Sequence, residues 1–202
     1  MSEEIGPDQI LRQLASNAPA GYSVGLHIRF AAPLIQYQNY PQAWLDHYTE
    51  QAYVMRDPMV AWGFSTVGTI RWSEIPFPDT FDIFGQAKNH GLNFGMAVAL
   101  GEMRSRTIAG AARSDREFTD AEMKDIADLV NRLHVATEPP DLTTAQKEAL
   151  QLIANGHRHT AAAAKLGISE SALKARLISA RTRLLARTTA EAIQRAKDYR
   201  LL

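Results

Sequence analysis

The chain has 202 residues, of which 46% are hydrophobic and 22% charged, values ordinary for a soluble globular protein with a sizeable core. It contains no cysteine, which excludes disulfides and thiolate chemistry. No apolar run is long enough to span a membrane, and the polar, acidic N-terminus is unlike a signal peptide. We therefore expect a cytoplasmic protein with no membrane partner.

The net charge of zero hides an asymmetry between the two ends of the chain. Residues 1–141 carry 11 Lys+Arg against 18 Asp+Glu, a net charge of −7, whereas residues 142–202 carry 11 against 4, a net charge of +7. A basic segment at one end is typical of nucleic-acid binding. On charge alone, an ordinary solvated basic surface explains it equally well.

The first two thirds of the chain mix helical and strand patterns. In chain order they predict a helix at 8–16, strands at 22–30 and 33–38, a helix opening at Pro41, a helix at 58–66, a strand at 69–72, a helix at 79–91, strands at 94–101 and 106–112, and a long helix at 117–137. The first two strands and the last two are expected to pair antiparallel. Helices around an antiparallel sheet predict an α+β domain, an α/β/α sandwich.

The helix that opens at Pro41 leads to an Asp57-Pro58 step. Trp44, Tyr48, Ala52 and Met55 recur at helical spacing and are expected to share one face. Asp57 before a proline predicts the N-cap of the next helix. The same carboxylate could anchor a pocket among the nearby aromatic side chains, and the local pattern does not decide between the two roles.

Residues 137–141, TEPPD, predict a linker, because two prolines in a polar stretch end the long helix. We therefore expect an α+β domain at 1–136 and an all-α domain at 142–202. The second domain has four helical patterns, at 143–155, 158–166, 169–186 and 188–198.

A short helix, a turn at Gly167, a Ser169 N-cap and a longer basic helix predict a helix-turn-helix. In that motif the helix after the turn enters the major groove of DNA. Its candidate DNA-binding residues are Ser169, Glu170, Ser171, Lys174, Arg176, Arg181 and Arg183. The apolar set Leu173, Leu177, Ala180 and Leu184 is expected to face the other helices. A plain helical bundle with a basic surface is the alternative.

The C-terminal pattern "LTTAQKEALQLIANG…AAAAKLGISESALKARL" resembles the helix-turn-helix of LuxR-type quorum-sensing transcriptional regulators. Two departures stand out: Gln146 replaces the usual Glu, and Ala161-Ala162-Ala163 replaces the usual Glu-Ile-Ala. The smaller Ala162 is expected to loosen the packing between two helices, which puts tight DNA binding in question but not the fold.

The N-terminal domain resembles the autoinducer-binding domain of the same family. Trp44, Tyr48, Asp57-Pro58 and Trp72 fall at the family's spacings, and Gly91 and Gly95 match its Gly-x-x-x-Gly segment. The resemblance implies a homodimer that binds promoter DNA, with RNA polymerase as a further candidate partner. The helix at 117–137 is our candidate dimer element.

The ligand implied by this resemblance is an N-acyl-homoserine lactone, lying between the sheet and a helical layer. Asp57 would accept from its amide N–H, Tyr48 would donate to the acyl carbonyl, and Trp72 would donate to the lactone carbonyl. The remaining wall candidates are Tyr40, Trp44, Phe84, Met96 and Leu26. The resemblance also places Ala111 where relatives often have a Ser or Thr that holds the acyl carbonyl. From spacing alone, Trp44 and Tyr48 on one helix face are better explained as core than as pocket.

Other classes of function fit the sequence less well. His157 and His159 lack a third metal donor, so we expect neither a metal nor a cofactor. Hydrolysis of a lactone needs a nucleophile–base pair or a metal, and the stretch around Asp57 offers neither, so we expect no enzyme. The serious rival is a LuxR-type modulator that does not bind DNA and acts by forming a heterodimer with another regulator.

Overall fold

The computed structural model describes residues 6–29 and 32–202. The chain divides into two compact units, residues 1–138 and 139–202, each with its own hydrophobic core. The last residue of the strand predicted at 22–30 lies outside the described residues. Within the described part of the chain, no helix is long and apolar enough to cross a membrane.

The N-terminal unit is built on a five-stranded antiparallel sheet with the strand order β2-β1-β5-β4-β3. The strands are β1 (Gly21–Ile28), β2 (Ile35–Gln38), β3 (Gly68–Arg71), β4 (Phe94–Leu100) and β5 (Arg106–Arg113). The predicted pairs β1–β2 and β4–β5 are both confirmed. The long central pairing of β1 with β5 joins the two hairpins into one sheet.

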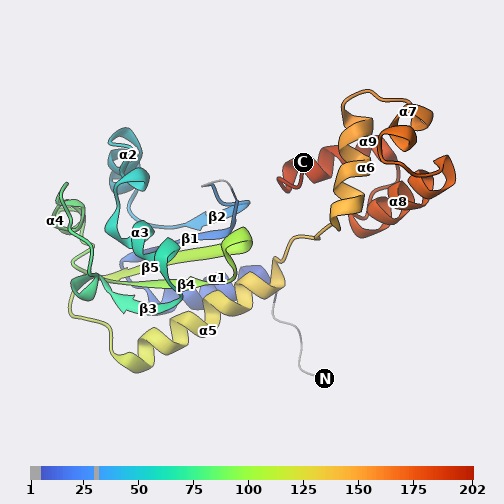
Figure 1. Ribbon diagram of the computed structural model, residues 1–202. Coiled ribbons are helices and arrows are strands. Elements are labelled where there is room, and N and C mark those ends of the chain that lie inside the picture. The colour runs from blue at the N-terminus through green and yellow to red at the C-terminus, as the bar shows by residue number, and fades with distance from the viewer. Residues whose placement is uncertain (1–5, 30–31) are drawn as a thin grey trace, which may run out of the picture. The chain divides into compact units, whose positions relative to one another are not determined.

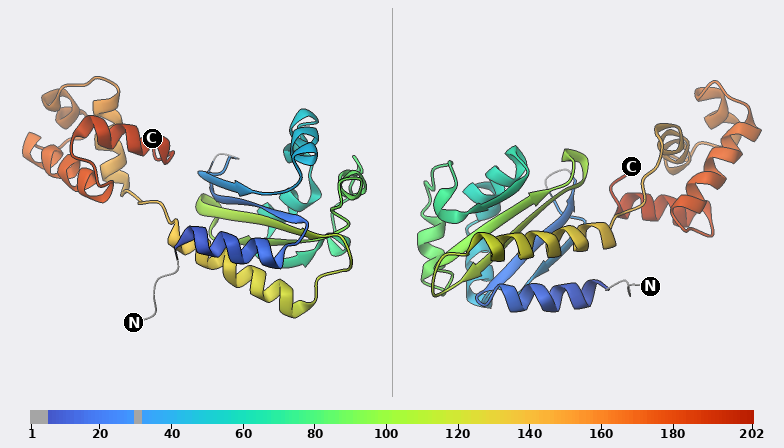
Figure 2. Two further views of the ribbon diagram at one scale, coloured as in Figure 1. Left: turned by 180° about the vertical axis from the view of Figure 1, so that it is seen from behind. Right: turned by 90° about the horizontal axis from the view of Figure 1, so that it is seen from below.

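Helices cover both faces of this sheet. They are α1 (Pro7–Asn17), α2 (Gln42–Glu50), α3 (Pro58–Ser65), α4 (Ile83–Lys88) and α5 (Asp120–Ala136), with short 3-10 turns at Tyr53–Met55, Trp72–Glu74 and Met103–Ser105. Figures 1 and 2 show α1 and α5 side by side across one face, which we call the α5 face. The opposite face, which we call the α3 face, carries α2, α3 and α4. This is the sandwich that the sequence predicts.

Alternation along β5 assigns its side chains to the two faces. Ala109 and Ala111 belong to the core that packs against α1 and α5. Gly110 faces the other way, because a Cβ at that position would lie 2.9 Å from Met59 Sδ and 3.0 Å from Tyr40 Oη. The α3 face is therefore the one that carries the Asp57 region.

The helix that opens after Pro41 ends earlier than its sequence pattern predicts. It stops at Glu50, and Ala52 adopts a left-handed conformation with φ of 51°. Met55 is consequently 79% exposed, so the predicted continuous face from Trp44 to Met55 is wrong. The change of chain direction at Ala52 buries Tyr53 in place of Met55. Tertiary packing therefore outweighs the helical propensity of this stretch.

Two other helix ends are fixed by side chains that accept hydrogen bonds from the backbone. The helix α5 begins with a capping box, since Thr119 accepts from the backbone of Glu122 and Glu122 accepts from the backbone of Thr119. The helix predicted at 79–91 is reduced to α4, because the Asp79 carboxylate accepts from the backbone N–H groups of Ile83 and Phe84.

A buried polar cluster lies where α5 ends. His27, at a bulge of β1 with φ of 51°, is fully buried, and its ring lies 4.4 Å from that of His134. The Thr137 hydroxyl donates to Leu133, so it accepts from His27 Nε2–H at 3.1 Å. His27 Nδ1 then accepts from the Ser105 hydroxyl at 2.9 Å. The neutral Nε2–H tautomer of His27 therefore satisfies both ring nitrogens.

The C-terminal unit is all helical. Its helices are α6 (Thr144–Ala154), α7 (His159–Lys165), α8 (Glu170–Arg183) and α9 (Thr189–Asp198). The apolar set predicted on α8 is confirmed as core, since Leu173, Leu177, Ala180 and Leu184 are all at most 3% exposed.

Candidate functional site

Asp57 is a buried carboxylate at the start of α3. Its side chain is held in the turn before Pro58, where Oδ1 accepts from the backbone N–H of Met59 at 2.7 Å. The predicted N-cap role is therefore confirmed. The residue is only 5% exposed, although a cap needs no burial.

The second oxygen of Asp57 faces α2. Tyr48 donates its hydroxyl hydrogen to Asp57 Oδ2 at 2.7 Å. Burial raises the pKa of the Asp57 carboxyl, while the hydrogen bonds from Tyr48 and Met59 act in the opposite direction. Burial and the adjacent Asp57 charge also raise the pKa of the Tyr48 phenol. Each carboxylate oxygen has two lone pairs, so Asp57 can accept a further hydrogen bond without losing its cap.

Trp72 presents a buried hydrogen-bond donor without a partner. It lies just after β3, and its indole stacks on Phe84 with a ring separation of 5.1 Å and an angle of 20°. The Trp72 Nε1–H group is buried and has no hydrogen-bond partner. The ring lies against the backbone of Gly95, where any Cβ would overlap it. Gly95, the second glycine of the Gly-x-x-x-Gly segment, thus leaves the space that the Trp72 indole occupies.

Tyr40 presents a second donor of the same kind. Its hydroxyl is buried without a hydrogen-bond partner and lies over the backbone of Gly110. Burial, followed by the nearby Asp57 charge, raises the pKa of the Tyr40 phenol. Buried polar groups in folded proteins are nearly always paired. Tyr40 and Trp72 belong to one hydrophobic cluster, so their two unpartnered donors indicate a place for oxygen acceptors there.

The aromatic cluster around Trp44 and Tyr48 includes side chains that the sequence patterns did not single out. The Trp44 ring lies 5.6 Å from that of Tyr48 and 5.5 Å from that of His90. Gln86 Oε1 receives hydrogen bonds from Tyr53 at 2.9 Å and from His47 Nε2 at 2.7 Å. His47 lies three residues after Trp44 on the same helix, which is the one signal that could have revealed it.

Two of the predicted wall residues lie on the wrong face of the sheet. Met96 and Leu26 are buried in the core formed with α1 and α5. Ala111 pairs with Met96 and shares that face, so it cannot offer a side chain toward Asp57. The residues that face the Asp57 region at this level are its neighbours Gly110 and Ala112, because a shift of one residue along a strand reverses the face.

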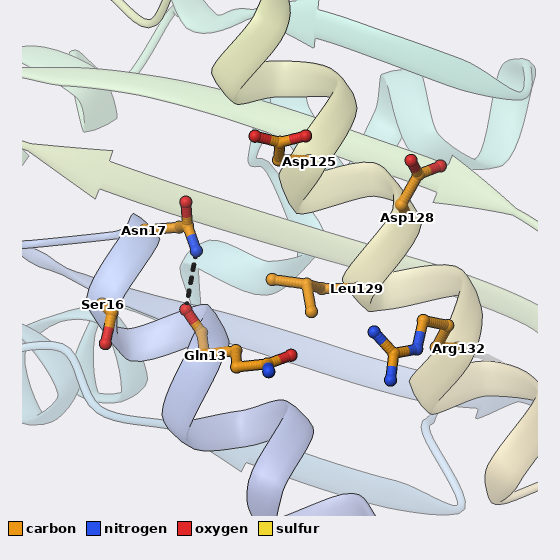
Figure 3. Close-up of a pocket in the computed structure, with 7 residues that line it drawn as sticks. All are labelled: Gln13, Ser16, Asn17, Asp125, Asp128, Leu129 and Arg132. Carbon is orange, nitrogen blue, oxygen red and sulfur yellow. Dashed lines mark hydrogen bonds between the residues drawn. The ribbon is translucent and has the colours of Figure 1, made fainter. Parts of the chain in front are cut away.

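The hollow drawn in Figure 3 is not the site built around Asp57. It has a volume of about 370 Å³, is open to solvent and lies between α1 and α5. Gln13 and Arg132 point toward each other across it, and Asp125 and Asp128 line its α5 side. The hollow lies on the α5 face of the sheet, whereas the aromatic cluster lies on the α3 face.

The candidate DNA-binding residues lie on α8 and its N-cap. Ser169 caps the helix by accepting from Ala172 N at 3.2 Å, and Glu170 accepts from the Thr160 hydroxyl at 2.6 Å. The fully exposed members of the set are Ser169, Glu170, Ser171, Lys174 and Arg183, while Arg176 and Arg181 are half-buried.

Two of these arginines are engaged within the unit. Arg181 donates to the carbonyl of Arg187 at 2.7 Å, and Arg183 donates to the carbonyl of Asp141 at 3.3 Å. Lys174 and Arg176 make no hydrogen bond or ion pair with the described residues. They are therefore the cations of α8 best placed for an outside partner.

The two departures on α6 and α7 have clear structural places. Gln146 completes a capping box with Thr143, and its amide also donates to Ser179 at 2.8 Å. The glutamine thus performs the capping role of the usual Glu without its charge. Ala162 is fully buried in the core of the unit.

A buried carboxylate, two unpartnered donors and an aromatic wall in an α/β/α unit fit a domain that binds a small molecule. Residues 22–139, more than half of the chain, match the family model described as the autoinducer binding domain. The chain belongs to this family. The resemblance predicted for the N-terminal unit is confirmed, and the match ends where the C-terminal unit begins.

Several regulators have similar sequences. The transcriptional activator protein AnoR of Acinetobacter nosocomialis is 28% identical over 168 residues, covering 74% of this chain and 71% of the relative. The HTH-type quorum-sensing regulator RhlR of Pseudomonas aeruginosa is 25% identical, covering 74% and 69%. Both relatives are named as regulators of transcription or quorum sensing.

Solved structures share the fold. Escherichia coli SdiA aligns with a TM-score of 0.61 at 20% identity, covering 98% of this chain and 92% of SdiA. A second SdiA structure, in complex with octanoyl-rac-glycerol, aligns with a TM-score of 0.58 at 20% identity, covering 96% and 89%. At this level of identity the likeness establishes the fold alone.

Proposed function

We propose that this chain is a quorum-sensing transcriptional regulator that binds an N-acyl-homoserine lactone in its N-terminal unit. The observation that carries the proposal is the set of buried polar groups on the α3 face, namely the Asp57 carboxylate and the unpartnered donors Tyr40 Oη and Trp72 Nε1. A lactone of this class has one amide N–H and two carbonyl oxygens, so it matches one acceptor and two donors.

In this proposal Asp57 accepts from the ligand amide and Trp72 donates to the lactone carbonyl. Either Tyr48, released from Asp57, or Tyr40 donates to the acyl carbonyl. Tyr40 enters as a donor because its hydroxyl is unpartnered, whereas that of Tyr48 is already engaged. Trp44 and Phe84 form the wall, and Met96 is omitted because it lies on the α5 face.

The C-terminal unit is proposed to bind promoter DNA through α7, the turn at Gly167 and α8. Gly167 has φ of 64°, a conformation that favours glycine and allows the sharp turn between the two helices. Lys174 and Arg176 would neutralise phosphates or reach bases in the major groove. The chain would act as a homodimer with α5 as the dimer element, because palindromic half-sites require a two-fold axis.

The ligand half of the proposal is tested by feeding lactones to an expression host and identifying small molecules that co-purify with the full chain by mass spectrometry. We expect one lactone to be enriched in the wild-type protein and lost from Asp57→Asn. Enrichment that is equal in both proteins would remove Asp57 from the binding site, and enrichment of no lactone would overturn the ligand class.

A non-DNA-binding modulator remains the second candidate, because two of the four α8 cations are engaged by backbone carbonyls. A gel shift over a range of salt concentrations separates the two functions. A DNA-binding regulator retards duplexes selected from a random library, with an affinity that falls steeply as salt rises. A modulator selects no duplex and instead forms a heterodimer with another regulator.

A further inference from the structure

The exposed side of α8 has a regular pattern of its own. The buried side chains of this helix begin at Leu173 and recur at spacings of four, three and four residues. A second set has the same spacings but starts two residues earlier, and its members are Ser171, Ala175, Ile178 and Thr182. Two residues turn an α-helix by about 200°, so this set lies on the side opposite the core. All four side chains are exposed, and we call them the outer stripe of α8.

The middle of the outer stripe is apolar. Ile178 is 58% exposed, and in the C-terminal unit, which the structure describes in full, only Leu185 is another large hydrophobic residue with such exposure. Ala175 lies three residues before Ile178 and is its neighbour on the helix surface. At the ends of the stripe, the Thr182 hydroxyl donates to the carbonyl of Ile178 at 3.2 Å, and the Ser171 hydroxyl shares a hydrogen bond of 2.9 Å with that of the N-cap serine. Both hydroxyls are thus already engaged.

Positive charge lies along both edges of the outer stripe. Lys174 and Arg176 precede and follow Ala175 in the chain, so they lie about 100° to either side of it around the helix. The segment 142–202 as a whole has a net charge of +7. The exposed side of α8 is therefore an uncharged, apolar stripe between two cations.

This arrangement is complementary to the DNA major groove, which is about 12 Å wide and admits one α-helix between two rows of phosphates. The outward side of such a helix meets the base edges, and its flanks meet the phosphates. The apolar group on the floor of the groove is the C5 methyl group of thymine. A protein partner would need acidic side chains along both edges of a narrow apolar stripe, whereas DNA has phosphates on both sides of every groove.

We propose that Ile178, with Ala175 beside it, contacts the C5 methyl group of a thymine in the operator, while Lys174 and Arg176 bind phosphates. This inference rests on the proposed DNA-binding function, and it deepens that proposal by naming the side chain that reads sequence. At this position the operator would be recognised by apolar contact rather than by hydrogen bonds.

The test starts from duplexes that the full chain selects from a random library, with and without octanoyl-homoserine lactone. Each thymine is then replaced in turn by uracil, which lacks only the C5 methyl group and keeps every hydrogen-bonding group of the base. Fluorescence anisotropy at a fixed salt concentration measures the affinities. We expect the wild type to lose affinity by about fourfold at one thymine of each half-site, the contribution of one buried methyl group.

Ile178→Ala should bind the thymine duplex more weakly and bind the thymine and uracil forms equally well. Ile178→Val, which keeps a branched apolar side chain, should retain part of the difference. Lys174→Gln should weaken both forms by the same factor, because it removes a phosphate contact. Leu185→Ala is the matched control, since Leu185 is 80% exposed and lies outside the outer stripe. It should change neither the affinity nor the uracil effect.

Duplex binding with no uracil effect, or a uracil effect that Ile178→Ala retains, would overturn the inference while the DNA-binding function stands. If Ile178→Ala binds the selected duplex as tightly as the wild type, the outer stripe does not face the bases and the inference fails. An Ile178-dependent uracil effect that no lactone influences would uphold the inference and count against the ligand half of the proposed function. If no duplex is selected, the inference and the DNA-binding function fail together.

Discussion

Tyr48 and Asp57, nine residues apart, are joined by a hydrogen bond of 2.7 Å from the phenol to the carboxylate. The bond ties the last turn of α2 to the N-cap of α3 across the 3-10 turn between them. A ligand amide that approaches Asp57 must either share Oδ2 with Tyr48 or displace it. In the proposed function, ligand binding at Asp57 would thereby be coupled to the position of α2.

Replacing Asp57 with Asn separates the capping role from ligand binding. Asn is as good an N-cap as Asp, so the free protein should lose little stability. The amide oxygen accepts more weakly than a carboxylate, and we expect lactone affinity to fall by about tenfold or more. Thermal shift with and without octanoyl-homoserine lactone measures both effects, and an undiminished shift would reduce Asp57 to a cap.

Trp72→Phe tests the unpartnered indole directly. The substitution keeps an aromatic ring on Phe84 but removes a buried N–H, which costs about 1–3 kcal/mol when left unpaired. We therefore expect the free protein to hold or gain stability while lactone affinity drops. Chemical denaturation and titration calorimetry give the two values, and a destabilised protein with unchanged affinity would assign Trp72 to the core.

Acid should destabilise the N-terminal unit through His27. Burial, aided by the neighbouring His134 and Arg29, lowers the pKa of His27 from 6.5 to about 4. Between pH 6.5 and about pH 4, His27 takes up a proton in the unfolded chain but stays neutral in the folded unit. Stability is therefore unaffected above pH 6.5, falls as the pH drops toward 4, and is flat below, a total loss of about 3 kcal/mol.

Denaturation followed by tryptophan fluorescence measures this loss, because Trp44, Trp62 and Trp72 all lie in the N-terminal unit. His27→Gln should flatten the profile in part. His134, whose pKa is also lowered by burial and raised slightly by Glu138, adds a loss of the same sign. His157→Gln in the C-terminal unit is the control, and a profile that His27→Gln leaves unchanged would exclude His27 as the source.

Charge reversal on α8 tests the proposed DNA surface. Lys174→Glu with Arg176→Glu should weaken binding to selected duplexes by about a hundredfold or more, since two phosphate or base contacts become repulsive. Lactone binding should remain unchanged. Lys197→Glu, an exposed reversal on α9, serves as the control. Equal affinity of both variants for DNA would remove α8 from the proposed interface.

The sequence predicted the fold well because its signals are local. The capping box of α5, the Asp57-Pro58 start of α3 and the strand alternation each depend on neighbouring residues, and all appear in the structure. The extent of α2 was mispredicted, since the helix formers after Glu50 are overruled by the burial of Tyr53.

The candidate site was only partly accessible from the sequence. The sequence spacing of Trp44, Tyr48, Asp57 and Trp72 indicates one shared site. It does not indicate which face of strands β4 and β5 this site packs against. Met96 was consequently placed on the wrong side. Tyr53 carries no pattern of its own, because its burial depends on contacts far along the chain.

The hydrogen bond between His27 and Thr137 spans 110 residues and ends where the linker begins. It anchors the exit point of the N-terminal unit to the bulge near the end of β1. A shift of β1 at this bulge would therefore strain or break a bond to the residue that follows α5, close to the point at which the chain leaves the N-terminal unit.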